Sequence, residues 1–328
     1  MFKRIAALFL ALMLLIPCFS AAEETGEMTE DEITALLWEM YQTENGDAEF
    51  MVLPDEYEEP AVGKTGIFNL LLIGVDTSDS SLKGRSDTML VASLNARTGE
   101  MRLLSFMRDT YVKIPGRGHN KLNAAYSYGG AKLLIKTLEN NFGIHIDGYL
   151  AVNYTLMVEL VDAIGGIEIT VSEDEVPKLN GILEYYNYQR GVKKETGKLK
   201  KAGTHNLTGL QAMSYARIRK LDSDFVRVER QQKVILAIYR KICQTDLAAL
   251  TNIVLTYIGR VGTDITLAKA TDLVLTLMSF EEIHTDSLRI PHNGAYSSKV
   301  INETYFIVPK LAKCKDKIHT FLYEYPDY

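Results

Sequence analysis

The stretch Ile67–Asp109 decides the fold class, and it reads IFNLLLIGVDTSDSSLKGRSDTMLVASLNARTGEMRLLSFMRD. It contains three short apolar runs rich in Leu, Ile and Val: Phe68–Val75, Met89–Leu94 and Met101–Phe106. Each run is too short for an independent helix and has the composition of a buried strand. A turn-like connection, Asn95–Gly99, separates the second and third runs, so we expect an antiparallel pair within a mixed sheet.

Charged residues gather where these predicted strands begin or end: Asp76, Arg85, Asp87, Arg108 and Asp109. Ligands of α/β proteins bind at the ends of strands. Carboxylates and guanidinium groups at such ends suggest a divalent metal ion and a phosphate. The alternative is that each is a solvated loop charge, which is the commoner role of a charged side chain.

The rest of the chain alternates strand-like and helix-like segments. Further strands are predicted at Tyr149–Asn153, Ile167–Val171, Met213–Arg217 and His284–Ile290. Helices are predicted at Ala131–Phe142, Leu156–Ile164, Phe225–Cys243, Leu247–Tyr257, Leu267–Met278 and Glu303–Leu322. The alternation predicts a layered α/β/α domain around a central mixed β-sheet over residues 66–328. The polar segment Glu173–His205, rich in Tyr and Lys, is interpreted either as a solvated insertion or as a flap over a phosphate-bearing substrate.

The first 22 residues carry a signal for export, and an acidic arm follows them. Residues 1–22 join Lys3 and Arg4 to an apolar run and end in Ser20-Ala21-Ala22, which is the pattern of a signal peptide. The alternative is an uncleaved N-terminal membrane anchor. Residues 23–65 form an acidic arm with a short amphipathic helix and a linker. We therefore expect the protein to face the outside of the cytoplasmic membrane.

Charge is unevenly distributed along the chain. Between Glu23 and Pro60 there are 14 Asp or Glu and no Lys or Arg. Lys3 and Arg4 precede this arm, so 34 of the 36 basic residues and 28 of the 42 acidic residues lie at positions 61–328, which gives that part a net charge of +6. A mildly basic domain suits an anionic ligand.

A second charged cluster lies in Met213–Gln232, MSYARIRKLDSDFVRVERQQ. Arg217 and Arg219 alternate with apolar residues and would face one side of a strand. On the next predicted helix, Arg227 and Gln231 are four positions apart and share a face. Converging arginines can neutralise a diphosphate, because a guanidinium binds phosphate through two hydrogen bonds. A nucleic-acid patch is the competing interpretation, but export and the lack of an aromatic stacking series argue against nucleic acid as a partner.

The cysteines indicate no metal centre. There are three, without a CxxC pair or a Cys/His cluster, so a zinc site is not expected. Cys18 lies in the N-terminal apolar run. Cys243 and Cys314 could form one disulfide, although the sequence does not show that they meet.

Seven ordered blocks carry a resemblance to a known family: NLLLIGVD, GRSDTMLVASLN, LLSFMRDTYVKIPG, HNKLNAAYSYGG, LVDAIGGIEITV, LTGLQAMSYARIR and DFVRVERQQKVI. In these blocks the sequence resembles the LytR-CpsA-Psr family of Gram-positive cell-envelope proteins, from about Phe68 to about Arg240 and more loosely to the C-terminus. Two positions depart from the family pattern. Thr77-Ser78-Asp79 follows the first aspartate where the family often has an arginine, and Phe106-Met107 replaces an Ile-Pro pair.

The resemblance implies a phosphotransferase of the cell surface. Such an enzyme moves a glycopolymer, for example teichoic acid or capsule, from a polyprenyl diphosphate carrier at the membrane surface to a peptidoglycan hydroxyl and releases polyprenyl phosphate. By resemblance, Asp76 and Asp87 hold Mg²⁺, or Mn²⁺ in its place. The implied ligands of the diphosphate are Arg85, Arg108, Arg217, Arg219, Arg227 and Gln231.

The expected chemistry is charge neutralisation at a diphosphate. A cation on Asp76 and Asp87, together with Arg108, Arg217 and Arg219, would stabilise charge that develops in the transition state. Either Asp109 or Asp76 could accept the proton of the attacking hydroxyl. The lipid tail needs an apolar slot, which helices over 133–138 and 152–164 could offer, unless their side chains are ordinary core. Two other functions are compatible with the same residues: a non-catalytic binder of envelope glycopolymers and a lipid diphosphate hydrolase.

Overall fold

The computed structural model describes residues 66–77, 82–218, 224–242, 244–245, 249, 252–253, 256–265, 269, 273, 284–301 and 303–324. No helix within this described part is both long and apolar enough to cross a bilayer. The predicted signal peptide or anchor and the acidic arm lie outside the described residues. So do Cys243 and most of the predicted helices Leu247–Tyr257 and Leu267–Met278.

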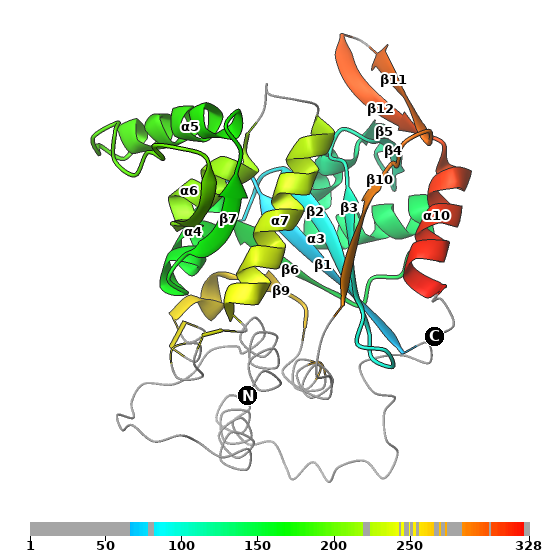
Figure 1. The fold of residues 1–328 in the computed structure, drawn as a ribbon. Coiled ribbons are helices and arrows are strands. Elements are labelled where there is room, and N and C mark those ends of the chain that lie inside the picture. The colour runs from blue at the N-terminus through cyan, green and yellow to red at the C-terminus, as the bar shows by residue number, and fades with distance from the viewer. Residues whose placement is uncertain are drawn as a thin grey trace, which may run out of the picture.

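A mixed sheet forms the centre of the fold (Figure 1). Its strands are β1 (Ile67–Val75), β2 (Ser86–Asn95), β3 (Met101–Phe106), β6 (Gly148–Asn153), β9 (Gly262–Thr263) and β10 (Thr285–Ile290). Their order is β10-β3-β2-β1-β6-β9. β2 pairs antiparallel with both β1 and β3, whereas β6 is parallel to β1 and β10 is parallel to β3. The predicted antiparallel pair and the mixed sheet are therefore confirmed.

Helices cover both faces of this sheet. α3 (Leu122–Phe142) and α10 (Leu311–Tyr323) pack on one face, and α7 (Asp224–Ile242) packs on the other. The helices α4 (Tyr154–Ala163), α5 (Glu175–Gln189) and α6 (Gly209–Ala216) belong to a second core. Leu71 and Leu104 pack in one core with α3 and α10. Gln232 of α7 donates a hydrogen bond of 2.9 Å to Ser105 Oγ. Side chains alternate along a strand, so Leu104 and Ser105 point to opposite faces, and the layered α/β/α fold is confirmed (Figure 1).

A second core lies beside the sheet. The hairpin β7 (Ile167–Val171) and β8 (Gly203–Leu207) packs there with α4, α5, α6 and α7. β7 was predicted as a strand, but it pairs with β8 and not with the central sheet. Two further hairpins are β4 (Tyr111–Ile114) with β5 (Gly118–Lys121) and β11 (Tyr296–Ile301) with β12 (Thr304–Pro309). A short 3-10 helix, η1, spans Ile258–Arg260.

The predicted strand Met213–Arg217 is wrong, because this segment belongs to α6. A capping box begins the helix: the Thr208 side chain accepts from the Gln211 N–H, and the Gln211 side chain accepts from the Thr208 N–H. α6 is buried on almost every side, so its sequence lacks the period of an amphipathic helix. It crosses α4 closely, since a Cβ at Gly209 would collide with the Val158 carbonyl group.

The other predicted helices differ in smaller ways. Glu303–Leu322 is only partly helical, because its first part, rich in aromatic and β-branched residues, forms β12 and the helix starts after Pro309. Ala131–Phe142 is helical within the longer α3, which is kinked at Gly129-Gly130. Leu134 and Leu138 of this helix are fully buried in the core, so these two leucines do not line an open slot.

A buried ion pair joins α5 to α7. Arg230 Nε is 2.8 Å from Glu175 Oε1, and the two side chains are 2% and 11% exposed. The Glu175 carboxylate also accepts the Ser172 N–H at 2.9 Å. Separating such a pair is costly, because the remaining charge stays buried without its partner. The pair therefore fixes the start of α5 against α7.

Replacing Glu175 tests this connection. We expect Glu175→Gln to lower the free energy of unfolding by about 3 kcal/mol, since the Arg230 charge stays buried. Urea unfolding measures the change. Glu173→Gln is the matched control, because Glu173 is exposed just before α5, and it should change stability by no more than about 0.5 kcal/mol. Equal losses in the two variants would contradict the assignment.

The same carboxylate predicts a loss of stability in acid. Burial alone would raise the pKa of Glu175, but the Ser172 N–H and the Arg230 guanidinium together hold this pKa below its usual value. A lowered folded pKa contributes stability above the unfolded pKa of about 4.3, and that stability is lost as the pH falls through the folded pKa. The stability gap between the wild type and Glu175→Gln should thus narrow below about pH 4. A gap of constant size in urea unfolding across this range would refute the prediction.

Candidate functional site

Two aspartates meet at one edge of the sheet because β1 and β2 are antiparallel. Val75 at the end of β1 is the register partner of Ser86 at the start of β2. Asp76 follows β1 directly, and its N–H donates to the Arg85 carbonyl at 2.9 Å. Asp87 is the second residue of β2. The strand pairing therefore places both carboxylates on the wall of the same cavity.

Arg108 lies against Asp87 for the same topological reason. β3 runs antiparallel to β2, so its end reaches the start of β2. Arg108 Nη1 is 2.8 Å from Asp87 Oδ1, and Arg108 Nε is 3.4 Å from Asp109 Oδ2. Lys121 Nζ is 2.6 Å from Asp109 Oδ1. Asp109 is buried and does not line the cavity, so its carboxylate holds the two cations that flank it.

Arg217 reaches the aspartates from the C-terminal end of α6. Its backbone N–H donates to the Met213 carbonyl, which makes Arg217 the C-cap of that helix. The guanidinium carbon lies 5.3 Å from the ring centroid of Tyr154 and 5.7 Å from that of Tyr186. Nη1 donates to the Tyr186 hydroxyl, and Nη2 donates to Asp76 Oδ1. One guanidinium is thus in contact with two aromatic rings and a carboxylate.

These residues surround a cavity of about 370 Å³. Asp76, Asp87 and Arg217 form its charged wall. Four residues of α5 form the other wall: Gly181, Ile182, Tyr185 and Tyr186. The volume is at the lower end of the range for small-molecule sites, and the combination of an apolar wall with a few polar groups is typical of them.

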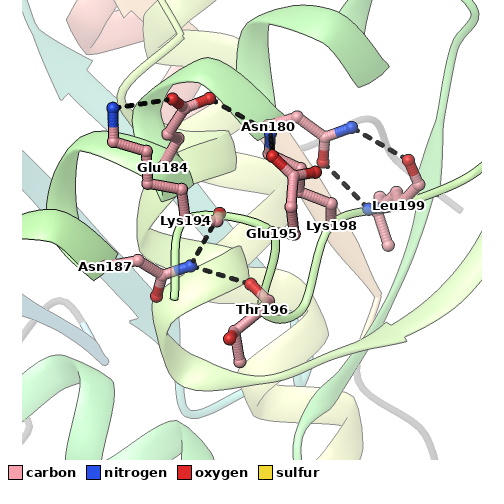
Figure 2. A network of polar contacts seen from close by, with 8 residues as sticks. All are labelled: Asn180, Glu184, Asn187, Lys194, Glu195, Thr196, Lys198 and Leu199. Carbon is pink, nitrogen blue, oxygen red and sulfur yellow. Dashed lines mark hydrogen bonds and ion pairs between the residues drawn. The ribbon is translucent and has the colours of Figure 1, made fainter. Parts of the chain in front are cut away.

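The loop after α5 holds this helix in place (Figure 2). Asn180 makes two hydrogen bonds of 2.9 Å with the backbone of Leu199. Asn187 donates to the Thr196 carbonyl at 2.8 Å. Ion pairs also join Glu184, Lys194, Glu195 and Lys198. The segment interpreted as an insertion or a flap is therefore a helix with an attached loop, and one side of the helix lines the cavity.

Among the residues that the structure describes, the predicted ligands Arg85, Arg227 and Gln231 do not line this cavity. Arg85 is exposed in the loop before β2. Arg227 is buried on α7, and Gln231, one turn later, is half-buried. Arg219 lies outside the described residues. The expectation that Arg217 and Arg219 share a strand face fails for Arg217, because it ends a helix.

The two aspartates supply hard oxygen donors on the cavity wall. Mg²⁺ is usually held by one or two carboxylates together with waters and substrate phosphates. Nowhere among the described residues do three or more His, Cys, Asp or Glu gather in a way that could hold a metal. Asp76 and Asp87 therefore fit a cation that shares its coordination with a phosphate.

Tyr186 is one of the cavity residues that the sequence analysis missed. Its hydroxyl contacts Arg217, and its ring lines the cavity. A signal for its helix was present, because Val176, Leu179 and Leu183 have helical spacing within an otherwise polar segment. The contact with Arg217 joins residues 31 positions apart and depends on the packing of α5 on α6, so no local pattern indicates it.

The chain is similar to a named transferase in sequence and to two solved structures in fold. The chain is 37% identical over 229 residues to the polyisoprenyl-teichoic acid–peptidoglycan teichoic acid transferase TagU of Enterococcus faecalis, covering 68% of this chain and 70% of that protein. A solved structure of TagT bound to LIIa-WTA matches with a TM-score of 0.63 and 26% identity, covering 84% of this chain and 97% of that one. The structure of the Bacillus subtilis protein YwtF (TagT) with bound octaprenyl pyrophosphate lipid matches with a TM-score of 0.57 and 25% identity, over 81% and 99% of the two chains.

The family model extends beyond the described domain at its N-terminal side. It begins within the acidic arm and ends in α10, and so includes β1, β2, β3 and the strand ends that carry the aspartates. The resemblance in the ordered sequence blocks is confirmed. The match over residues 37–319 shows that this chain belongs to the LytR_cpsA_psr family.

Proposed function

We propose that this protein transfers an anionic glycopolymer from a polyprenyl diphosphate carrier to a hydroxyl of peptidoglycan and releases polyprenyl phosphate. The observation that carries the proposal is the cavity that joins Asp76 and Asp87 to Arg217, with Arg108 bound to Asp87. Cationic and carboxylate groups on one wall are the components of a site for a metal-bound diphosphate. The named activity of the Enterococcus faecalis relative and the octaprenyl pyrophosphate in the TagT structure support this choice of substrate.

The reaction replaces a phosphoanhydride bond of the donor with a phosphoester bond to the acceptor. The acceptor hydroxyl oxygen bonds to the phosphorus that carries the glycan, and the P–O bond to the bridging oxygen breaks. The electron pair leaves with polyprenyl phosphate, and the hydroxyl proton passes to a base. Arg217 and Arg108 stabilise the negative charge on the phosphate oxygens. Mg²⁺ or Mn²⁺ held by Asp76 and Asp87 would supply further charge neutralisation when bound.

The surroundings of the two candidate bases differ. Asp109 is buried and contacts Arg108 and Lys121, so we assign it to the positioning of Arg108. Asp76 is about half exposed and lines the cavity. Of the two, Asp76 is therefore the carboxylate that an acceptor hydroxyl can approach.

The reaction takes place outside the cytoplasmic membrane in this proposal. The signal-like pattern of residues 1–22 supports export, with either cleavage or retention as an anchor. Peptidoglycan and lipid-linked wall polymers are assembled on that side, and the relatives are named for activity on them.

Two substitutions test the transferase site. We expect Asp87→Ala and Arg108→Ala each to reduce transfer from a labelled lipid diphosphate donor to peptidoglycan by roughly 10²-fold. Arg108→Ala removes a cation beside the phosphates, and Asp87→Ala removes a ligand of the proposed metal ion together with the partner that orients Arg108. Labelled peptidoglycan and released polyprenyl phosphate are both measured. Arg117→Ala, at an exposed position between β4 and β5, is the control and should leave transfer unchanged.

The pattern of products distinguishes the rival functions. Release of polyprenyl phosphate without labelled peptidoglycan would identify a hydrolase and overturn the transferase assignment. Donor binding without any release would identify a glycopolymer-binding protein. Full transfer by both alanine variants would leave the reaction in place but show that the site lies elsewhere.

The pH dependence of transfer tests the role of Asp109. We expect Asp109→Asn to lower kcat by roughly tenfold, because Arg108 loses a charged partner. The acidic limb of the pH–rate profile should persist, since a positioning carboxylate is not the group whose ionisation gives that limb. Its disappearance in Asp109→Asn would show that Asp109 is the base.

A further inference from the structure

Tyr186 lines the cavity but has no role in the reaction proposed above. It contributes no charge and no metal ligand, yet its hydroxyl and its ring both contact Arg217. We propose that Tyr186 is a positioning residue, which fixes the Arg217 guanidinium in the orientation that binds a phosphate of the lipid-linked diphosphate. The proposal deepens the proposed function and rests on it for the identity of the ligand.

Each terminal nitrogen of the Arg217 guanidinium has a hydrogen-bond partner. Nη1 donates to the Tyr186 hydroxyl and Nη2 to Asp76. The rings of Tyr154 and Tyr186 lie within 6 Å of the guanidinium carbon, at 5.3 and 5.7 Å, which is the range of a cation–π contact. A free arginine side chain loses much rotamer entropy when it is ordered by a ligand. The contacts with Tyr186, Tyr154 and Asp76 order the Arg217 side chain before a ligand binds.

Tyr186 can fulfil this role because its helix is fixed at several points. Glu175 at the start of α5 is paired with the buried Arg230. Asn180 and Asn187 bind the backbone of the following loop (Figure 2). Gln211 of α6 also donates to the Gly197 carbonyl of that loop at 2.5 Å. α5 is thus held against α7 at its start and against α6 through the loop that follows it, which gives the guanidinium a rigid support.

The Tyr186 hydroxyl is available as a neutral acceptor at neutral pH. Its partial burial raises the pKa of Tyr186 above the usual value, and this outweighs the opposite effect of the nearby Arg217 charge. The hydroxyl therefore keeps its proton and accepts the Arg217 N–H through an oxygen lone pair. A neutral partner orients the guanidinium without cancelling the positive charge that a phosphate needs.

Ligand binding, measured in a double-mutant cycle, tests the proposal without relying on catalysis. The probe is geranyl diphosphate, its Kd is measured by calorimetry in the presence of Mg²⁺, and the proteins are the full chain, Tyr186→Phe, Arg217→Lys and the double variant. We expect Tyr186→Phe to raise Kd by roughly tenfold, because it removes a hydrogen bond to a charged group. In the Arg217→Lys background the same change should raise Kd less than about twofold.

Tyr188→Phe is the matched control. Tyr188 lies on α5, is exposed and does not line the cavity, so loss of its hydroxyl should leave Kd unchanged. The urea midpoint of Tyr186→Phe is measured as well, and an unaltered midpoint shows that any change in Kd is local.

Two outcomes would overturn the proposal. An unchanged Kd in Tyr186→Phe would show that the hydroxyl does not support Arg217. An equal rise of Kd in both backgrounds would show that Tyr186 acts on the ligand independently of Arg217. The transfer assay is separate: if wild-type protein binds the probe but transfers no glycan, the proposed function fails while the positioning role is still decided by the cycle.

Discussion

The site depends on the register of three antiparallel strands. Val75 opposite Ser86 and Leu90 opposite Ser105 bring the end of β1, the start of β2 and the end of β3 to one edge of the sheet. A shift by one residue would turn every side chain of a strand to the opposite face. β1 is buried on both faces and packs there in two different cores, so such a slip would misplace its apolar side chains. The cores therefore fix the register, and the register fixes the charged residues at the edge.

The second half of the site depends on helices rather than on strands. Arg217 extends from the end of α6, and α6 is positioned by its close crossing with α4 at Gly209. α5 forms the opposite wall of the cavity and is joined to α7 through Glu175 and Arg230. A buried ion pair is a costly way to gain stability, because both charges lose their hydration. Its value here is geometric, since it fixes the helix that contributes Tyr186.

Those elements of the fold that depend on short-range sequence patterns could be predicted from the sequence. Phe68–Val75 reads as a strand because burial on both faces leaves a continuous apolar run, and the residues next to such strands are then expected at the sheet edge. The strand predicted at Met213–Arg217 failed because burial on almost every side of α6 removes helical periodicity, so apolar and polar residues happen to alternate. Tyr186 was missed for another reason: its partner is distant in the sequence, and only the packing of two helices brings them together.

Both carboxylates of the cavity wall form an ion pair with an arginine, and this pairing affects how a phosphate can bind. Two aspartates on one wall repel a phosphate, but each contacts an arginine, so their negative charge is compensated. A diphosphate that binds Arg217 must share that guanidinium with Asp76 or displace the carboxylate from it. Asp109 avoids this competition because it is buried and neutralised by Arg108 and Lys121. It can orient Arg108 without adding negative charge to the cavity wall, whereas an unpaired carboxylate in the same place would weaken the binding of every anion.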